Sequence, residues 1–189
     1  MKRDMIVRRA GAEETQALSE QLADVLLDCV EGGASVSFML PMARATALDF
    51  WEKVSGGVAR GERILFVAED AEGVAGTVQL IMEMPENQPH RADVAKLLVH
   101  RRARGRGIGE RLMLALEAAA GELGKTVLVL DTANAAAERL YERLGWQRVG
   151  SVPAYALLPG GGLCDTVFFH KQLRPASLTC PNAVKSKRL

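Results

Sequence analysis

The segment with the clearest chemical character lies between an expected strand and an expected helix. Four arginines and three glycines fall within one stretch, Arg101-Arg102-Ala103-Arg104-Gly105-Arg106-Gly107-Ile108-Gly109. The glycines let the backbone bend so that several amide N–H groups point into one concavity, and the helix that follows adds its positive N-terminal end. The guanidinium groups add charge and bidentate donors. The sequence therefore predicts an anion site here, best suited to phosphate or pyrophosphate.

Other phosphate-binding motifs match this segment less well. A nucleoside triphosphate loop needs a lysine after its last glycine, and no lysine follows here. A dinucleotide fingerprint needs Gly-x-Gly-x-x-Gly, but Glu110 or Leu112 stands where the third glycine belongs. Asp131 does lie at an expected strand end, where a ribose-binding acid could be. Dinucleotide binding and a basic surface turn without a ligand therefore remain alternatives.

Histidine and cysteine, the usual metal ligands and nucleophiles, are scattered along the chain. His90, His100 and His170 are isolated, and none has a metal-ligand partner at a useful spacing. We expect these histidines to be structural or surface residues, and we predict no metal site. Cys164 lacks a nearby histidine, so it is expected to be an inert thiol and not a nucleophile.

Apolar spacing predicts the elements that must position these residues. An apolar face from Leu18 to Cys29 indicates a helix that ends at Gly32-Gly33, and Pro41 suits the first position of a second helix. Further helices are expected over residues 108–123 and 135–144, and strands over residues 6–9, 64–68, 74–82, 93–99, 127–131, 147–152 and 166–173. Early consecutive strands suggest an antiparallel meander, and later strand–helix–strand units suggest local parallel pairing. The predicted fold class is α/β, with a mixed sheet.

Length and composition limit the class of protein. The chain has 189 residues, of which 48% are hydrophobic and 25% charged, as is usual for a globular protein of one domain. Residues 174–189 hold four basic side chains and no acidic one, and we expect them to form a disordered tail after a single domain at residues 1–173. The body is then slightly acidic, which argues against a general nucleic-acid binder.

Apolar runs and cysteines bear on where the protein works. No run approaches the ~18 apolar residues of a membrane helix, and the start has no apolar stretch long enough for a signal peptide. Cys29, Cys164 and Cys180 form no close-spaced pair. The odd count and wide spacing are typical of reduced thiols in a cytoplasmic protein, and no membrane partner is expected.

Two motifs together resemble a known family. Residues 104–109 are similar to the Arg/Gln-x-x-Gly-x-Gly/Ala signature of the GNAT acetyltransferases. Residues 134–146 resemble that family's Asn-x-x-Ala-x-x-Leu-Tyr-x-x-x-Gly-aromatic stretch. The two motifs occur in the family's order, separated by a helix and a strand, and the resemblance covers residues 5–173. It implies a single GNAT-like domain, with a mixed, mostly antiparallel central sheet flanked by helices.

The resemblance also implies a cofactor site for acetyl-CoA, used as co-substrate. In similar enzymes the glycine-rich segment binds pyrophosphate through backbone amides, and the strand before it offers backbone groups to the pantetheine arm. The tyrosine that aligns with Tyr141 donates a proton to the CoA sulfur, and the asparagine that aligns with Asn134 contacts the arm or caps its helix. The implied cofactor-binding residues are Leu97, Leu98, Val99, Arg104, Gly105, Arg106, Gly107, Ile108, Gly109, Asn134 and Tyr141.

A narrower resemblance concerns the acceptor. Residues 31–39, 87–97 and 160–163 look like the tabtoxin-resistance branch of the family, whose members acetylate an amine on a β-lactam toxin. It implies that Asp93 and Asp131 lie near the acceptor amine, although the branch has a longer glutamate where Asp93 aligns. The implied catalytic residues are Tyr141, Asp131 and Asp93.

The resulting expectation is an N-acetyltransferase in which a small amine attacks acetyl-CoA directly, in a ternary complex. Two alternatives remain: a protein or peptide N-acetyltransferase, and an acyl-CoA-binding module without turnover. Nucleic-acid binding through residues 101–106 is disfavoured, because the basic cluster is short and has no interleaved aromatic residues. The protein is expected to be a monomer or a homodimer.

Overall fold

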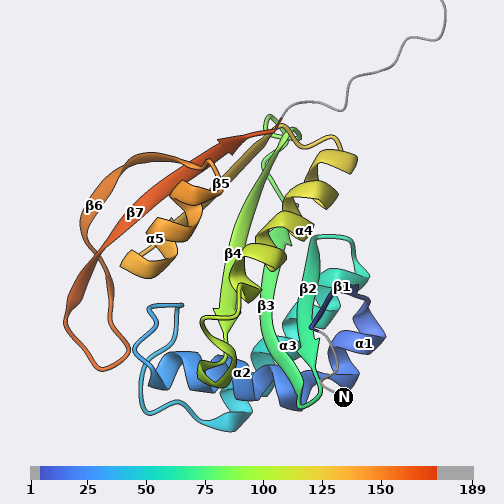
Figure 1. Cartoon of the computed structure of the whole chain (residues 1–189), viewed down its shortest axis with the longest axis vertical. Coiled ribbons are helices and arrows are strands. Elements are labelled where there is room, and N and C mark those ends of the chain that lie inside the picture. Colours follow the sequence, from blue (N-terminus) through green and yellow to red (C-terminus); the bar gives the residue numbers. More distant parts are fainter. Residues whose placement is uncertain (1–4, 174–189) are drawn as a thin grey trace, which may run out of the picture.

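The computed structural model describes residues 5–173, which form one mixed sheet with helices on both faces (Figure 1). In chain order the elements are β1 (Ile6–Ala10), α1 (Ala12–Ala17), α2 (Ser19–Glu31), α3 (Arg44–Ala59), β2 (Arg63–Asp70), β3 (Gly73–Ile81), β4 (Arg91–Val99), the 3-10 turn η1 (Arg101–Ala103), α4 (Ile108–Glu122), β5 (Val127–Thr132), α5 (Ala135–Arg143), β6 (Gln147–Leu157) and β7 (Leu163–Gln172). The predicted fold class is confirmed. The predicted tail, residues 174–189, lies outside the described residues.

The sheet has the order β1-β2-β3-β4-β5-β7-β6, and every neighbouring pair is antiparallel except β4 with β5. That parallel pair is short, because it ends at the register pair Asp93↔Val129. Beyond this pair the two strands diverge, as Figure 1 shows. The backbone of the second half of β4 is therefore free of a partner on its β5 side, which positions the cavity described below.

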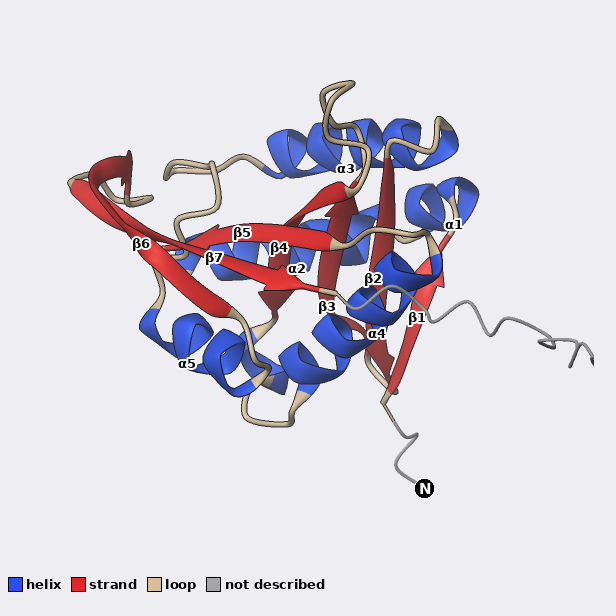
Figure 2. Cartoon of the chain, turned by 90° about the horizontal axis from the view of Figure 1, so that it is seen from above, coloured by secondary structure: helices blue, strands red, loops and turns tan. Residues whose placement is uncertain are grey.

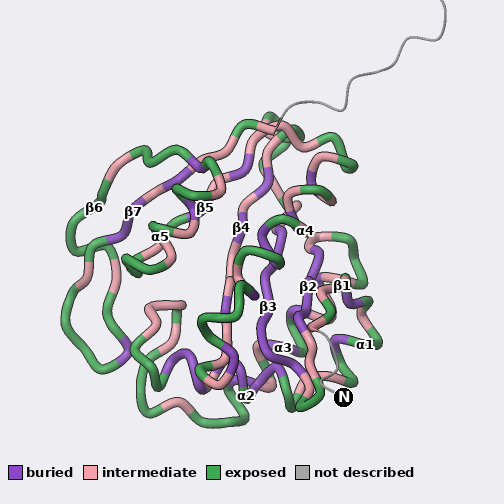
Figure 3. Tube along the Cα trace, viewed as in Figure 1, coloured by how far each residue is buried: buried purple, intermediate pink, exposed green. Residues whose placement is uncertain are grey.

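Helices lie on both faces of the sheet (Figure 2), and each face has its own hydrophobic core. On one face, α4 packs a stripe at four-residue spacing, Ile108, Leu112 and Leu116, against the strands. On the other face, α2 and α3 bury Leu22, Leu26 and Trp51. The central strands β2 and β3 are consequently buried, whereas the edge strand β6 is largely exposed (Figure 3). Among the described residues, no helix is both long and apolar enough to cross a membrane.

The structure corrects the predicted start of the second long helix. Pro41 is not its first residue; α3 begins at Arg44, after the extended Ala43. The reason is a tertiary contact, because the N–H of Leu40 donates to the carbonyl of Pro159, 2.8 Å away, and keeps this part of the chain in a loop.

Other elements also differ from the sequence prediction, most of all α1 and β6. The short helix α1 has no apolar periodicity, and Thr15 is its only buried residue. It was therefore not predicted. Strand β6 continues past Val152 and Pro153 to Leu157, with a register shift between Val152 and Ala156. An edge strand tolerates proline, because one side of its backbone needs no partner.

Candidate functional site

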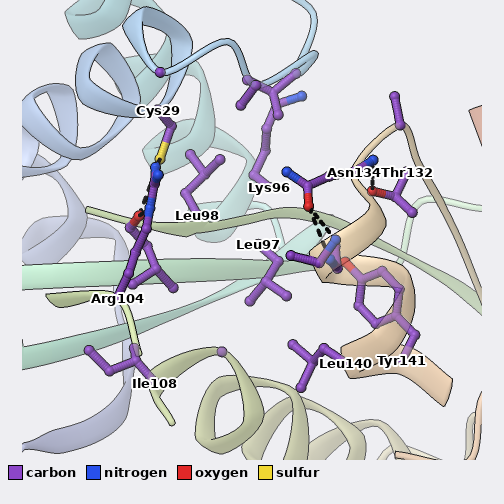
Figure 4. Close-up of a pocket in the computed structure, with 18 of the residues that line it drawn as sticks. Cys29, Lys96, Leu97, Leu98, Arg104, Ile108, Thr132, Asn134, Leu140 and Tyr141 are labelled. Atoms are coloured by element: carbon purple, nitrogen blue, oxygen red, sulfur yellow. Dashed lines mark hydrogen bonds between the residues drawn. The ribbon is translucent and has the colours of Figure 1, made fainter. Parts of the chain in front are cut away.

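A cavity of about 680 Å³ opens where β4 and β5 diverge (Figure 4). Its walls come from four parts of the chain: the α2–α3 loop (residues 32–37), the second half of β4 (residues 94–99), the turn that leads into α4, and the segment from the end of β5 through α5 (residues 131–143). The cavity therefore joins the two sequence motifs, which are separated in the chain by α4 and β5.

The glycine-rich turn forms an open cradle at one end of the cavity. Gly105 and Gly107 have left-handed backbone conformations, with φ of 74° and 72°, and Gly107 is the N-cap of α4. A Cβ atom added at either position would meet no atom within 4 Å, so the space next to the backbone is free. The first N–H groups of a helix have no partner inside the helix. Those of Ile108 and Gly109, which line the cavity, are thus available to an anion.

Two aspartates with little-exposed side chains partly neutralise the arginines of this turn. Asp70 on β2 pairs with Arg102 at 2.9 Å and Arg106 at 3.0 Å. Burial raises the pKa of Asp70, but the N–H of Glu72 and these two guanidinium groups outweigh burial, so the pKa lies below its ordinary value. Arg106 accordingly does not line the cavity, in contrast to its implied place in the cofactor site.

The second aspartate, Asp28 on α2, holds the other two arginines. It accepts hydrogen bonds from the N–H and Nε of Arg101, and one of its oxygens lies 3.9 Å from Arg104. Arg104 lines the cavity and donates from Nε to the carbonyl of Val99 at 3.0 Å. Of the four arginines of the turn, Arg104 is therefore the one that lines the cavity, beside the backbone amides of Ile108 and Gly109.

Strand β4 carries a bulge beside the cavity. Its register with β3 shifts between the pairs Gln79↔Ala95 and Thr77↔Leu98, and Lys96 lies in the bulge with φ of 54°. Thr77 Oγ1 donates to the carbonyl of Lys96 at 3.1 Å and holds this conformation. The implied pantetheine-binding residues Leu97, Leu98 and Val99 all line the cavity. The carbonyl of Val99 already accepts from Arg104 and Cys29, which leaves it less available to a ligand.

Helix α5 brings Asn134 and Tyr141 to the same cavity. Asn134 caps the helix, because its Oδ1 accepts from the N–H groups of Ala136 at 2.8 Å and Ala137 at 3.1 Å. Its amide nitrogen is turned away from the helix (Figure 4). The ring of Tyr141 is 5% exposed and packs on Trp146 and Phe169, with centroid distances of 6.0 and 5.7 Å. Burial, together with the charge of Asp131, raises the pKa of Tyr141 well above its ordinary value.

The two candidate carboxylates lie on one face of the sheet but in different surroundings. Asp131 is exposed, lines the cavity and accepts from Thr166 Oγ1 at 2.9 Å. Asp93 does not line the cavity, and it pairs with Arg91 at 3.0 Å. Burial raises the pKa of Asp93, with Arg91 opposing this effect and Asp131 reinforcing it. Of the implied catalytic residues, the structure thus brings Tyr141 and Asp131 together and leaves Asp93 nearby, outside the cavity wall.

Lys96 is a cavity residue that the sequence analysis missed. Its Nζ donates to Ser37 Oγ at 3.2 Å and lies about 6 Å from the ring centroids of Phe38 (6.0 Å) and Phe50 (5.9 Å). Burial lowers its pKa, the charge of Asp131 opposes that shift, and the charge of Arg63 adds to it. The available signal was one charged residue within the apolar run from Val94 to Val99.

Contacts between distant loops tie the α2–α3 loop, which lines the cavity, to the β6–β7 hairpin. Ser35 Oγ donates to the carbonyl of Leu157 at 3.2 Å, and Leu40 N–H donates to Pro159. Cys164 Sγ, which was expected to be inert, lies 3.7 Å from Ser35 Oγ. The α2–α3 loop and the β6–β7 hairpin therefore form a bridge beside the cavity. Within residues 5–173 no cluster of three or more His, Cys, Asp or Glu side chains could hold a metal ion.

Comparisons with known proteins agree with this architecture. A family model described as an acetyltransferase (GNAT) domain matches residues 61–148. A curated relative, an uncharacterized N-acetyltransferase from the hisH-hisA intergenic region of Azospirillum brasilense, is 33% identical over 130 residues, which are 68% of this chain and 75% of the relative.

Solved structures share the fold over nearly the whole chain. A candidate acetyltransferase from Salmonella typhimurium, solved with its cofactor acetyl-CoA, has a TM-score of 0.74 at 21% identity, and the match covers 96% of this chain and 99% of the other. A ribosomal-protein-alanine N-acetyltransferase from Brucella melitensis has a TM-score of 0.71 at 25% identity, with coverage of 89% and 99%.

Proposed function

Because the chain belongs to the GNAT family of acetyltransferases, we propose that it transfers the acetyl group of acetyl-CoA to the amine of a small molecule. The observation that carries the small-molecule part is the bridge between the α2–α3 loop and the β6–β7 hairpin. A peptide acceptor needs an open groove in which residues on both sides of the amine can lie. The bridge restricts such a groove on this side of the cavity and favours a compact acceptor.

The cavity suits acetyl-CoA as the donor. The open backbone at Gly105 and Gly107 has room for a pyrophosphate against the first turn of α4. From there the divergent part of β4 offers backbone groups along Leu97 and Leu98 toward Tyr141. Acetyl-CoA supplies a thioester, and the protein's own residues supply orientation and proton transfer.

Tyr141 and Asp131 divide the two proton tasks of the reaction. The amine must lose a proton to become a nucleophile, and the departing thiolate must gain one. Asp131 is an exposed carboxylate that binds the ammonium form of the acceptor and passes its proton to water. Tyr141 keeps its proton at neutral pH, since even an ordinary phenol ionises only near pH ~10 and burial raises this pKa further, and it can donate that proton to the thiolate. Asp93 supports this site through its charge.

An acceptor screen tests the proposal. The protein is mixed with acetyl-CoA and either small primary and secondary amines or a panel of peptides, and free thiol is followed over time. Turnover on small amines that exceeds turnover on every peptide supports the proposal. Robust turnover on peptides alone, with dependence on residues several positions from the amine, contradicts it.

A protein N-terminus is the second candidate acceptor. The observation in its favour is the 25% identity to the Brucella melitensis protein, whose name specifies a ribosomal-protein alanine. The same screen separates the two candidates when peptides that begin with alanine are included. The cytoplasmic location and the monomeric or homodimeric state stay predictions.

A further inference from the structure

We infer that Lys96 selects acceptors that carry an anionic group beside the reacting amine, by pairing its ammonium with that group. The inference rests on the proposed small-molecule acetyl transfer and specifies the acceptor of that same site. Lys96 is half-buried, and among residues 5–173 no carboxylate lies within 4.0 Å of its Nζ. A half-buried lysine ammonium without a carboxylate partner can pair with an anion that enters the cavity it lines.

The backbone around Lys96 adopts energetically unfavourable conformations that hold the lysine side chain at the cavity. Lys96 and Ser37 are both non-glycine residues with left-handed conformations, with φ of 54° and 77°, and they meet through the hydrogen bond from Nζ to Oγ. Left-handed backbone is unfavourable for residues with a side chain and is concentrated at functional sites. The two strained positions thus place one ammonium group between the β4 bulge and the α2–α3 loop.

The surroundings of the ammonium favour an anion as its missing partner. Phe38 and Phe50 cover it with apolar rings, and their contact with each other is edge-on, with a centroid distance of 5.3 Å. An apolar wall lowers the local dielectric, so an ion pair formed there is stronger than one in water. Ser37 Oγ satisfies one of the three ammonium donors and adds no charge.

Lys96 and Asp131 present opposite charges to one cavity. An acceptor whose ammonium meets Asp131 can place a carboxylate, or a similar anion, at Lys96. This arrangement predicts a small acceptor with both charges, in contrast to the purely cationic amine that two carboxylates alone would favour. The anion fixes the molecule at one end, so that the amine is oriented toward the thioester.

The test uses a pair of small amine acceptors that are identical except that one carries a carboxylate where the other carries an uncharged carboxamide. The ratio of kcat/KM for the two members is measured for the wild type and for Lys96→Met, which keeps the aliphatic stem and removes the charge. Wild type should prefer the carboxylate, and Lys96→Met should lower the ratio about 10- to 100-fold, as expected for the loss of a hydrogen bond to a charged group. Because both members are measured on one preparation, a partly unfolded variant does not change the ratio.

Three controls separate selection from a structural effect. Lys96→Arg keeps the positive charge and should retain the preference for carboxylate. Lys96→Glu should reverse it. Ser37→Ala removes the hydrogen bond that ties the loop to Lys96, and it should leave the ratio near the wild-type value. If Ser37→Ala lowers the ratio as much as Lys96→Met, Lys96 acts by holding the loop, and the inference is overturned.

The outcomes also distinguish this inference from the proposed function. Equal kcat/KM for both members in the wild type, or an unchanged ratio in Lys96→Met, overturns the inference while small-molecule acetyl transfer stands. Turnover of peptides and of neither small acceptor overturns the proposed function, and the inference with it.

Discussion

The phenol of Tyr141 is the clearest candidate for a proton donor at the scale of single residues. Tyr141→Phe deletes only the hydroxyl and keeps the ring on Trp146 and Phe169. Loss of a general acid lowers a rate about 10²- to 10⁴-fold. We expect kcat to fall by that factor and the Kd for acetyl-CoA to change little, as measured by steady-state kinetics and by calorimetry. A variant that turns over at the wild-type rate would leave Tyr141 as a packing residue.

The pH dependence of the rate gives a second test of Tyr141. An ordinary phenol ionises near pH ~10, but burial and the charge of Asp131 raise the pKa of this one. The protonated donor should therefore persist above pH ~10, where a solvent-exposed tyrosine would be lost. The kcat of the wild type and of Tyr141→Phe is measured against pH, up to the limit of protein stability. We expect the wild-type profile to show no alkaline decrease that is missing from the profile of the variant. An alkaline limb near pH ~10 that is absent from the variant would contradict the raised pKa.

Asp93 should lower the stability of the folded protein at neutral pH. Its pKa is raised on folding, so the folded state holds the ionised carboxylate less favourably than the unfolded state does. Asp93→Asn should raise the Tm at pH 7, and the gain should shrink as the pH falls toward the ordinary carboxyl pKa of ~4, where both states become protonated. Thermal melts of both proteins over this pH range check the prediction. A lower Tm for the variant at pH 7 would show that the ion pair with Arg91 dominates.

For single residues, the sequence predicts which ones belong to the site better than it predicts where their side chains point. The motifs predict that Tyr141, Asn134 and Asp131 share one site, and the structure places all three on the cavity wall. Arg106 belongs to the same motif, but its side chain turns to Asp70, which lies on β2 far from it in the sequence. Lys96 was missed because its access to the cavity depends on a β-bulge, and one charged residue within an apolar run does not identify a bulge.

The turn into α4 can be tested by two glycine substitutions at opposite ends of one element. Gly107 and Gly124 have nearly the same left-handed φ, 72° and 74°, and a Cβ atom added at either would have no other atom within 4 Å. Gly107→Asp places a carboxylate at the cradle, whereas Gly124→Asp adds equal strain and charge beyond the far end of the helix. Acetyl-CoA at ~100 times its Kd should stabilise the wild type by ~2.7 kcal/mol. We expect this ligand-induced shift in Tm to persist in Gly124→Asp and to vanish in Gly107→Asp.

The same melts check the identity of the donor. NAD and ATP also carry pyrophosphate, so they serve as comparison ligands at matched concentrations. A strong shift with either of them and none with acetyl-CoA would be incompatible with the cavity as a site for the acetyl donor.

Elements were predictable where their own residues determine them. Helix α4 has a regular apolar stripe between a glycine N-cap and Gly124, and its predicted bounds agree closely with Ile108–Glu122. The start of α3 was wrong, because Leu40 bonds to Pro159 in a distant loop. Strand β6 extends further than predicted. Its side chains are exposed and show no regular pattern, but its backbone pairs with β7, and this pairing makes the segment a strand.

At the scale of the whole molecule, the sheet consists of two antiparallel blocks joined at one short seam. The block β1-β2-β3-β4 meets the block β5-β7-β6 through a parallel pairing that ends at Asp93↔Val129. The alternation of strands and helices predicts a mixed sheet, but it does not predict how soon the parallel pair ends. The parallel pair ends shortly before the β4 bulge at Lys96, which no local sequence pattern identifies.

The seam leads to a prediction about hydrogen exchange. Acetyl-CoA bound along β4 and at the start of α5 bridges the two blocks on the side where no backbone pairing joins them. Binding should therefore slow amide exchange at the cavity and also in β7, whose Val167 and Phe169 pack in the core shared with β4 and α4. In the free protein we expect β2 and β3 to exchange most slowly. The stretch of β6 between Val152 and Ala156 should exchange fastest among the strands, because its pairing with β7 is interrupted there.

Exchange measured by mass spectrometry with and without acetyl-CoA checks this prediction, with Gly107→Asp at the same ligand concentration as the control. The control should show the free-protein pattern in β7, because a ligand that does not bind cannot link the blocks. Slower exchange confined to the turn into α4 and to residues 94–99 would mean that the ligand acts only where it touches. In that case α4 and α5 already hold the two blocks together without a ligand. The divergence of β4 and β5 then shapes the cavity, but the stability of the sheet does not depend on acetyl-CoA.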